Sequence, residues 1–224
     1  MKSASLLGVV AAVLFGGYLM YVLSFTVDSD DGMEGIVMDG GPAMNMASDT
    51  GGSSEGFQNA INIMMEGIMR PATGYPDVDF VRMMISHHEG TFAMAALEMQ
   101  FGRDKIAQAL ADNAITSQKK ELTFLKDWLG QQDLSIMKIV PQANQANYAS
   151  MLSMMKGMSF NFTGNTDVDF ANVMIPHHEG AIDMAKVVLQ FGTDAEIRKF
   201  AEKMIATKKN EIALLRDWLA KATP

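Results

Sequence analysis

Apolar residues recur every three or four positions through the last three quarters of the chain, which is the spacing of an amphipathic α-helix. Proline lies mostly at the boundaries of these stretches, as at Pro76 and Pro141. In the first half the pattern predicts a short helix near 56–70 and two long helices near 77–101 and 104–130. We therefore expect an all-α fold.

The second half of the chain repeats the first. Residues 73–130 align without a gap on residues 163–220 at an offset of 90, and 26 of the 58 aligned pairs are identical. Self-similarity at one fixed spacing indicates one helical unit used twice, packed about a pseudo-two-fold axis. Each unit contributes one long hairpin, so the sequence predicts a four-helix bundle with the two short helices packed on it. The expected divisions are a first repeat at 56–130, a linker at 131–141 and a second repeat at 142–224.

Aspartates stand at the predicted helix starts. Asp77 and its repeat partner Asp167 occupy the expected N-cap positions of the long helices. Asp104 and Asp194 begin the following helices, each after a glycine that should end the preceding one. Pro176 is inside the second long helix, where it should kink the helix or remove one backbone hydrogen bond.

The start of the chain differs from the repeats. Residues 6–25 form an uncharged apolar run long enough to cross a bilayer as a helix, with Lys2 as the only earlier charge. The run is longer than the core of a cleaved signal peptide, and no Ala-x-Ala site follows it. We expect residues 1–27 to be a signal anchor, which makes the protein periplasmic and anchored in the inner membrane. Cleavage would instead give a secreted protein.

Residues 28–55 are rich in Gly, Ser and Asp and almost free of aromatic residues, so they should form a flexible tether. Methionines in such a segment have no core to fill. Two alternative explanations are open: sequence drift in an unconstrained linker, and capture of a soft metal. The tether methionines are Met33, Met38, Met44 and Met46, of which Met44 and Met46 are the candidate metal ligands.

Composition narrows the possible functions. Of 224 residues, 21 are methionine and none is cysteine, which removes disulfides, thiolate metal sites and cysteine nucleophiles. The net charge is −8 and no basic cluster is visible, which argues against a nucleic-acid partner. An acidic chain suits cations instead.

All four histidines lie in two copies of one motif, MISHHEG at 84–90 and MIPHHEG at 174–180. At 3.6 residues per turn, the first histidine of each pair shares a largely apolar stripe with two methionines, and the second histidine lies about 100° around the helix. This stripe should face the bundle interior. The candidate metal ligands are Met84, His87, His88, Met94, Met174, His177, His178 and Met184.

Each hairpin also brings a carboxylate to the height of the histidines. Counting outward from the turn places Glu121, repeated as Glu211, within a turn of the pair, where it could accept the second N–H of a ligating imidazole. A surface glutamate paired with Lys119 or Lys120 is the alternative. The short helices supply further candidate sulfur ligands: Met64, Met65, Met154 and Met155.

The donor types select the metal. A di-iron bundle needs Glu-x-x-His on its inward faces, a pattern that this sequence lacks. A zinc-protease helix needs His-Glu-x-x-His, but Phe92 and Ile182 occupy the position of the second histidine. Thioether and imidazole without thiolate form a soft set that suits Cu(I), and Ag(I) by the same logic. Zinc bound by histidines alone would leave the methionines unexplained.

The runs DVDFVRMMISHHEGTFAMA and DVDFANVMIPHHEGAIDMA, followed by QKKELTFLKDWL and KKNEIALLRDWL, resemble the bacterial CopM-like family of exported helical-bundle proteins, long classed as a domain of unknown function. The resemblance covers about residues 57–222. It implies a ferritin-like bundle and copper binding linked to copper tolerance, with the eight candidate ligands as metal positions. Two features depart from the family. Leu125 and Leu215 occupy a position where the family often has methionine, and Lys208 occupies the position of the family's usual glutamine, which the first repeat has as Gln118.

The sequence-based hypothesis is therefore an exported, membrane-tethered copper-binding protein. It would sequester Cu(I) or pass it to a copper exporter, contribute to copper homeostasis and resistance, and carry out no covalent chemistry of its own. One alternative is a metal-dependent redox enzyme of the cuprous oxidase type, although the sequence shows no general base besides the histidines. The other is a structural bundle whose histidines belong to the core.

Overall fold

A computed structural model describes residues 52–134, 138–159 and 161–222. This part of the chain forms helices and no strand, which confirms the predicted all-α fold for these residues. The helices are α1 (Gly52–Ile68), α2 (Pro76–Phe101), α3 (Lys105–Gly130), α4 (Pro141–Gly157), α5 (Thr166–Phe191) and α6 (Ala195–Ala222). None of these helices is both long and apolar enough to cross a bilayer. The expected signal anchor at 1–27 lies outside the described residues.

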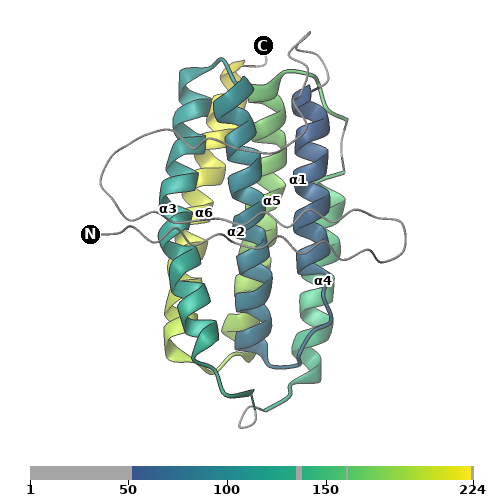
Figure 1. The fold of residues 1–224 in the computed structure, drawn as a ribbon, viewed down its shortest axis with the longest axis vertical. Helices are drawn as coiled ribbons and strands as arrows, with labels where there is room; N and C mark the ends of the chain where they lie inside the picture. Colours follow the sequence, from purple (N-terminus) through teal and green to yellow (C-terminus); the bar gives the residue numbers. More distant parts are fainter. Residues whose placement is uncertain (1–51, 135–137, 160, 223–224) are drawn as a thin grey trace, which may run out of the picture. The chain divides into compact units, whose positions relative to one another are not determined.

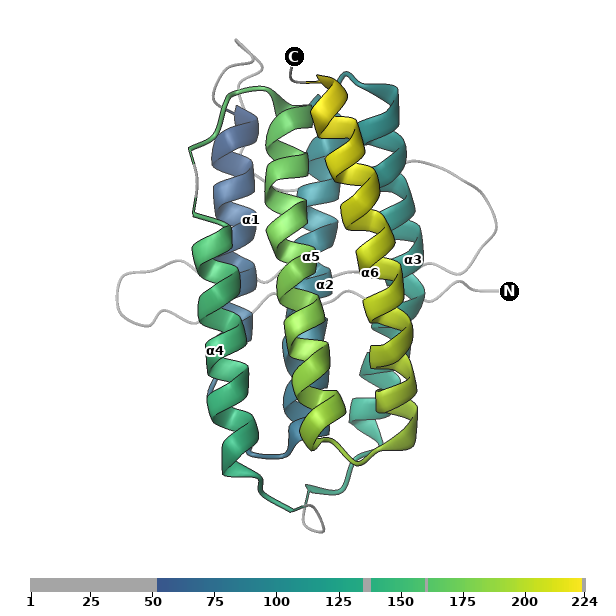
Figure 2. The same ribbon diagram turned by 180° about the vertical axis from the view of Figure 1, so that it is seen from behind.

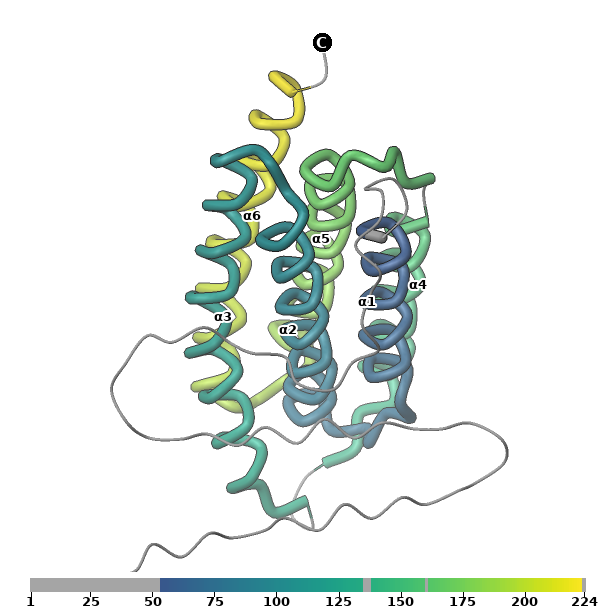
Figure 3. The backbone as a smooth tube through the Cα atoms, turned by 45° about the horizontal axis from the view of Figure 1, so that its top comes forward, coloured from purple at the N-terminus to yellow at the C-terminus, as the bar shows by residue number. Residues whose placement is uncertain are grey.

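The two central helices, α2 and α5, stand side by side (Figure 1). Helices α3 and α6 cover one side of this pair, and α1 and α4 cover the other, as the view from behind also shows (Figure 2). In Figure 3 the helices form two rows, α1–α2–α3 and α4–α5–α6. The shorter helices α1 and α4 therefore do more than pack on a four-helix bundle, because they enclose the central pair from its second side.

The duplication predicted from the sequence reappears in space. Helix α5 begins and ends 90 residues after α2, and matching positions of the two helices are buried alike. Phe80 and Phe170 are each 1% exposed, and burying a side chain of this kind stabilises a fold by about 1.5–3 kcal/mol. Many methionines also belong to this core. They are Met64, Met65, Met83, Met84, Met94, Met151, Met154, Met158, Met174, Met184 and Met204.

Two of the four predicted N-caps are correct. Asp104 accepts the backbone N–H groups two and three residues ahead of it at the start of α3, and Asp194 does the same at α6. Asp77 and Asp167 were wrongly predicted as caps, because they lie inside the first turns of α2 and α5. The N-cap of α5 is Asn165, whose side chain accepts the N–H of Val168 at 3.3 Å.

The misassigned aspartates join the two repeats instead. Asp77 in the first repeat accepts the backbone N–H groups of Thr193 and Asp194, at 2.9 and 3.3 Å, in the turn of the second repeat. Asp167 accepts two backbone N–H groups of the first repeat's turn, both at 2.9 Å. Each hairpin turn is thus held by a carboxylate from the other hairpin.

Helix α5 continues through Pro176 from Thr166 to Phe191. A Cβ at Gly157 of α4 would lie 2.9 Å from the Cβ of Pro176, so the proline ring faces α4 across a glycine. The predicted disturbance therefore does not end the helix, and the ring serves as a packing surface for the neighbouring helix.

Glu98 is a fully buried carboxyl near the end of α2, and its repeat counterpart is Val188. Burial raises the pKa of Glu98 to about 8, and the neighbouring carboxylates of Asp167 and Asp104 add to the effect. At neutral pH the side chain therefore holds its proton inside the fold.

A raised carboxyl pKa makes the folded state lose stability as pH rises. The unfolded value is 4.5 and the folded value about 8, so the contribution of Glu98 is fully present below pH 4.5 and is lost as pH rises through 8. We expect the unfolding free energy of Glu98→Gln, measured with urea from pH 5 to 9, to increase relative to that of wild type as pH rises. Glu89→Gln, at the exposed Glu89 of the same helix, is the control and should show no such trend. Parallel curves for Glu98→Gln and wild type would contradict the assignment.

Candidate functional site

The four histidines meet where α2 and α5 face each other. The rings of His87 and His177 are stacked, with their centroids 3.6 Å apart and their planes 29° from parallel. All four imidazoles are at most 2% exposed, so the stripe that carries them points inward as expected. Because His87 and His177 are equivalent residues of the two repeats, their contact marks the pseudo-two-fold axis.

The stacked pair makes its hydrogen bonds through Nε2. The Nε2–H of His87 donates to the backbone carbonyl of His177 at 2.9 Å. The Nε2–H of His177 donates to the Sδ of Met64 on α1 at 3.1 Å. A carbonyl and a thioether can only accept, so both rings carry their proton on Nε2 and have a lone pair on Nδ1.

The other two histidines face glutamates on the flanking helices. The Nε2–H of His88 donates to Glu121 on α3 at 3.0 Å, and that of His178 donates to Glu211 on α6 at 2.9 Å. Both carboxylates lie where counting along the hairpin placed them, and Glu121 pairs with His88 at a side-chain exposure of 17%. A carboxylate in this position fixes the tautomer of its imidazole. Its support of a metal ligand stays a prediction.

All four Nδ1 atoms are consequently buried acceptors, and none has a hydrogen-bond partner among the described residues. Leaving a buried polar group unsatisfied costs about 1–3 kcal/mol. Native cores contain few such groups, and each calls for a cause such as a bound ion or water. Four of them on neighbouring rings in the centre of the bundle form the main chemical feature of this site.

The surroundings keep the imidazoles uncharged. Burial lowers the pKa of His87 and His177 well below 6.5, and the adjacent imidazoles lower it further. Burial also lowers the pKa of His88, and it lowers that of His178 to about 4, with the ammonium of Lys208 as the next cause. Neutral imidazole is the form that binds metals, so the rings are ready to do so at neutral pH.

Glycines beside the histidines admit sulfur from the short helices. A Cβ at Gly90 would lie 2.7 Å from the Sδ of Met64, and a Cβ at Gly180 would lie 2.5 Å from the Sδ of Met154. Met64 was only a secondary candidate from the sequence, yet its sulfur contacts His177. The sequence signal that could have predicted this contact is the glycine at the end of each HHEG motif, because it leaves room for a neighbouring side chain.

The remaining candidate methionines fall into three groups. Those on the central helices are fully buried in the core: Met84, Met94, Met174 and Met184. On the short helices, Met65 is buried and Met155 is exposed at 38%, outside the core. Met44 and Met46 lie outside the described residues. Among the described side chains, no three His, Asp or Glu residues are arranged to hold a metal ion.

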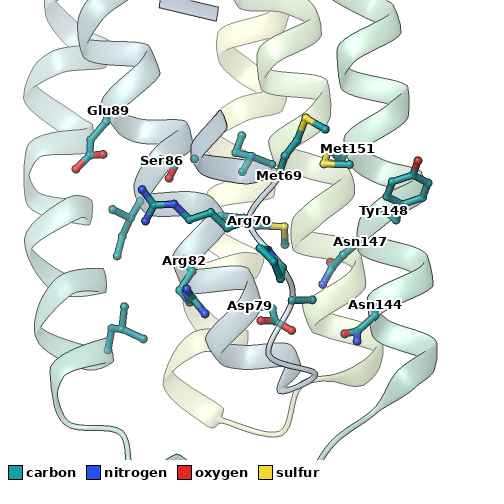
Figure 4. A pocket seen from close by; sticks show the side chains of 17 residues that line it. Met69, Arg70, Asp79, Arg82, Ser86, Glu89, Asn144, Asn147, Tyr148 and Met151 are labelled. Carbon is teal, nitrogen blue, oxygen red and sulfur yellow. The ribbon is translucent and has the colours of Figure 1, made fainter. Parts of the chain in front are cut away.

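Two cavities lie among the described helices. One, of about 480 Å³, is bounded mainly by α1, α2 and α4. Figure 4 shows Arg70 and Arg82 on one side of it and Asn144, Asn147 and Tyr148 on the other. A second, of about 460 Å³, lies among α4, α5 and α6. Neither is lined by a histidine, so the histidine centre is a packed interior site.

This duplicated helical fold with paired histidines belongs to a recognised family. Residues 77–219 match the family described as "Domain of unknown function (DUF305)", and the chain is a member of it. Among solved structures, the crystal structure of a DUF305 fragment from Deinococcus radiodurans is similar at 23% identity and a TM-score of 0.49. That match covers 65% of this chain and 96% of the fragment. A search of curated proteins gives no match.

The two glycines provide a matched test of the sulfur contact. In Gly90→Ala the new methyl group displaces Met64 from His177, whereas Gly180→Ala displaces Met154. Each overpacked variant should lose about 1–3 kcal/mol of unfolding free energy. Only Gly90→Ala should shift the side-chain ¹⁵N resonances of His177 strongly, measured by two-dimensional NMR. Equal shifts of His177 in both variants would show that the Met64 contact is not specific.

Proposed function

We propose that this protein binds Cu(I) at the centre of the bundle, on imidazole nitrogen and thioether sulfur. The observation that carries the proposal is the set of four buried Nδ1 lone pairs without donors, beside the sulfur of Met64. A purely structural histidine in a core would have both ring nitrogens satisfied. Here one nitrogen of each ring is held by the fold and the other is available.

The donor chemistry supports copper in its reduced state. Neutral imidazole and thioether, with no thiolate in the chain, are soft to intermediate donors that suit Cu(I) and also Ag(I). Glu121 and Glu211 would then act on His88 and His178 through their second nitrogens, as carboxylates commonly do in metal sites. Met64, a further candidate from the sequence, is added to the eight main candidate ligands because its sulfur contacts His177.

The same features support a role in holding or transferring the ion. The four imidazoles are at most 2% exposed and neither of the two cavities is lined by a histidine, which suits retention of the ion rather than turnover of a substrate. With the expected signal anchor, the protein would sequester Cu(I) at the outer face of the inner membrane or hand it to a copper exporter. Its contribution to the cell would be copper homeostasis and resistance.

An anaerobic Cu(I) titration of the full chain against a chromophoric competitor tests the proposal. Wild type should compete for the ion, and the double variant His87→Ala/His177→Ala should lose this binding. Glu121→Gln should weaken binding by about 10–100-fold, because it removes only the support of an imidazole. Met99→Leu, at a methionine that is 43% exposed, is the matched control and should bind as wild type does.

Three results would count against a copper-holding centre. Absence of competition by wild type would favour the structural bundle. Unchanged binding in the folded double variant would place the ion elsewhere, such as on the tether methionines. Catalytic oxidation of Cu(I) with turnover would favour the redox enzyme.

The pH dependence of the affinity identifies the donors. Protons compete with the metal for imidazole but not for thioether, so affinity must fall as pH decreases. Because burial lowers the pKa of these histidines, the fall should lie below 6.5 and reach toward the value of about 4 at His178. The titration is repeated at intervals from pH 8 to 4.5, with circular dichroism to confirm the fold. An affinity independent of pH would assign the ion to methionines alone.

A further inference from the structure

At one buried position the two halves of the histidine centre differ in charge. Gln118 on α3 corresponds to Lys208 on α6, three residues before Glu121 and Glu211 respectively. Both side chains are at most 1% exposed. The repeat therefore places an amide in one half and an ammonium at the equivalent position of the other.

In the second repeat the ammonium satisfies the glutamate. The Nζ of Lys208 donates to the Oε2 of Glu211 at 2.8 Å, and the same oxygen accepts His178 at 2.9 Å. Burial raises the pKa of Glu211, but the hydrogen bond from His178 and the charge of Lys208 outweigh burial and bring it to about 2. This half therefore contains a paired positive and negative charge.

In the first repeat the corresponding groups are left open. In the part of the chain that the structure describes, neither the amide oxygen nor the amide nitrogen of Gln118 has a hydrogen-bond partner. Within the described residues Glu121 pairs with His88 and with no ammonium. This half thus combines a carboxylate without a cation, an unpartnered buried amide and an unpartnered Nδ1 on His88.

We propose that Lys208 is a fixed internal cation that excludes a metal ion from the second half of the centre, so that each chain binds one Cu(I) in the first half, at His87 and His88. The proposal rests on the copper-binding function proposed above. A cation at His178 would be repelled by the ammonium at short range in a region of low dielectric. A cation at His88 meets the carboxylate of Glu121 instead.

The stoichiometry of Cu(I) binding tests this asymmetry. The full chain is titrated anaerobically with the tether methionines changed to leucine, so that ions held by the tether are not counted. This parent should bind one equivalent and Lys208→Gln two. Lys208→Leu, which removes the charge and adds no donor atom, should also bind two. Gln118→Lys in the parent should bind none in the competitor's range.

These variants have a structural precedent, because Lys208→Gln recreates the arrangement already present around Gln118. Urea unfolding and circular dichroism check that each variant is folded. A second readout needs no variant: in the parent, Cu(I) should shift the Nδ1 resonance of His88 and leave that of His178 in place, as seen by ¹⁵N NMR.

The outcomes separate this inference from the proposed function. Two equivalents in the parent, or equal shifts of His88 and His178, overturn the asymmetry and leave copper binding intact. A single equivalent in folded Lys208→Gln or Lys208→Leu shows that the charge does not exclude the ion, and overturns it too. No binding by the parent or by wild type overturns the copper function itself.

Discussion

The contact between the imidazole rings of His87 and His177 sets the arrangement of the whole bundle. Burying neutral rings between α2 and α5 requires that every ring nitrogen carrying a proton find an acceptor. The flanking helices supply three of these acceptors, as glutamates on α3 and α6 and a thioether on α1, and the fourth is the backbone carbonyl of His177 on α5. The outer helices therefore have a chemical role as well as a packing role. They hold the rings in one tautomer, and the lone pairs that result give the centre its chemistry.

Much of this could be read from the chain because it follows from regular spacing. Helical periodicity placed the helices, and the 90-residue offset predicted the internal symmetry. Residues equally far from a hairpin turn lie opposite each other, and for this reason the sequence predicted Glu121 beside the histidine pair, where it contacts His88. Asp77 was misplaced because a capping rule considers only the residue's own helix, whereas its acceptor bonds go to the other repeat. The contact of Met64 with His177 was likewise tertiary and outside the reach of local pattern.

The methionine content has more than one cause. Of the methionines in the described residues, eleven are buried in the core, where a flexible, polarisable side chain fills irregular space between helices. Packing therefore accounts for part of an excess that the sequence alone suggested assigning to metal. The unpartnered imidazole nitrogens are more specific, because hydrophobic packing gives no reason to bury an acceptor without a donor. The copper proposal gains more from nitrogen geometry than from sulfur abundance.

The exchange of aspartates between hairpin turns has a consequence for the origin of the fold. Each turn presents backbone N–H groups that a carboxylate of the other half satisfies. A half-length ancestor could have completed these bonds only with a second copy of itself, through an isologous contact of the kind that symmetric dimers use. The present chain is then a dimer made covalent. Fusion freed its two copies to diverge, which no symmetric assembly of identical subunits can do.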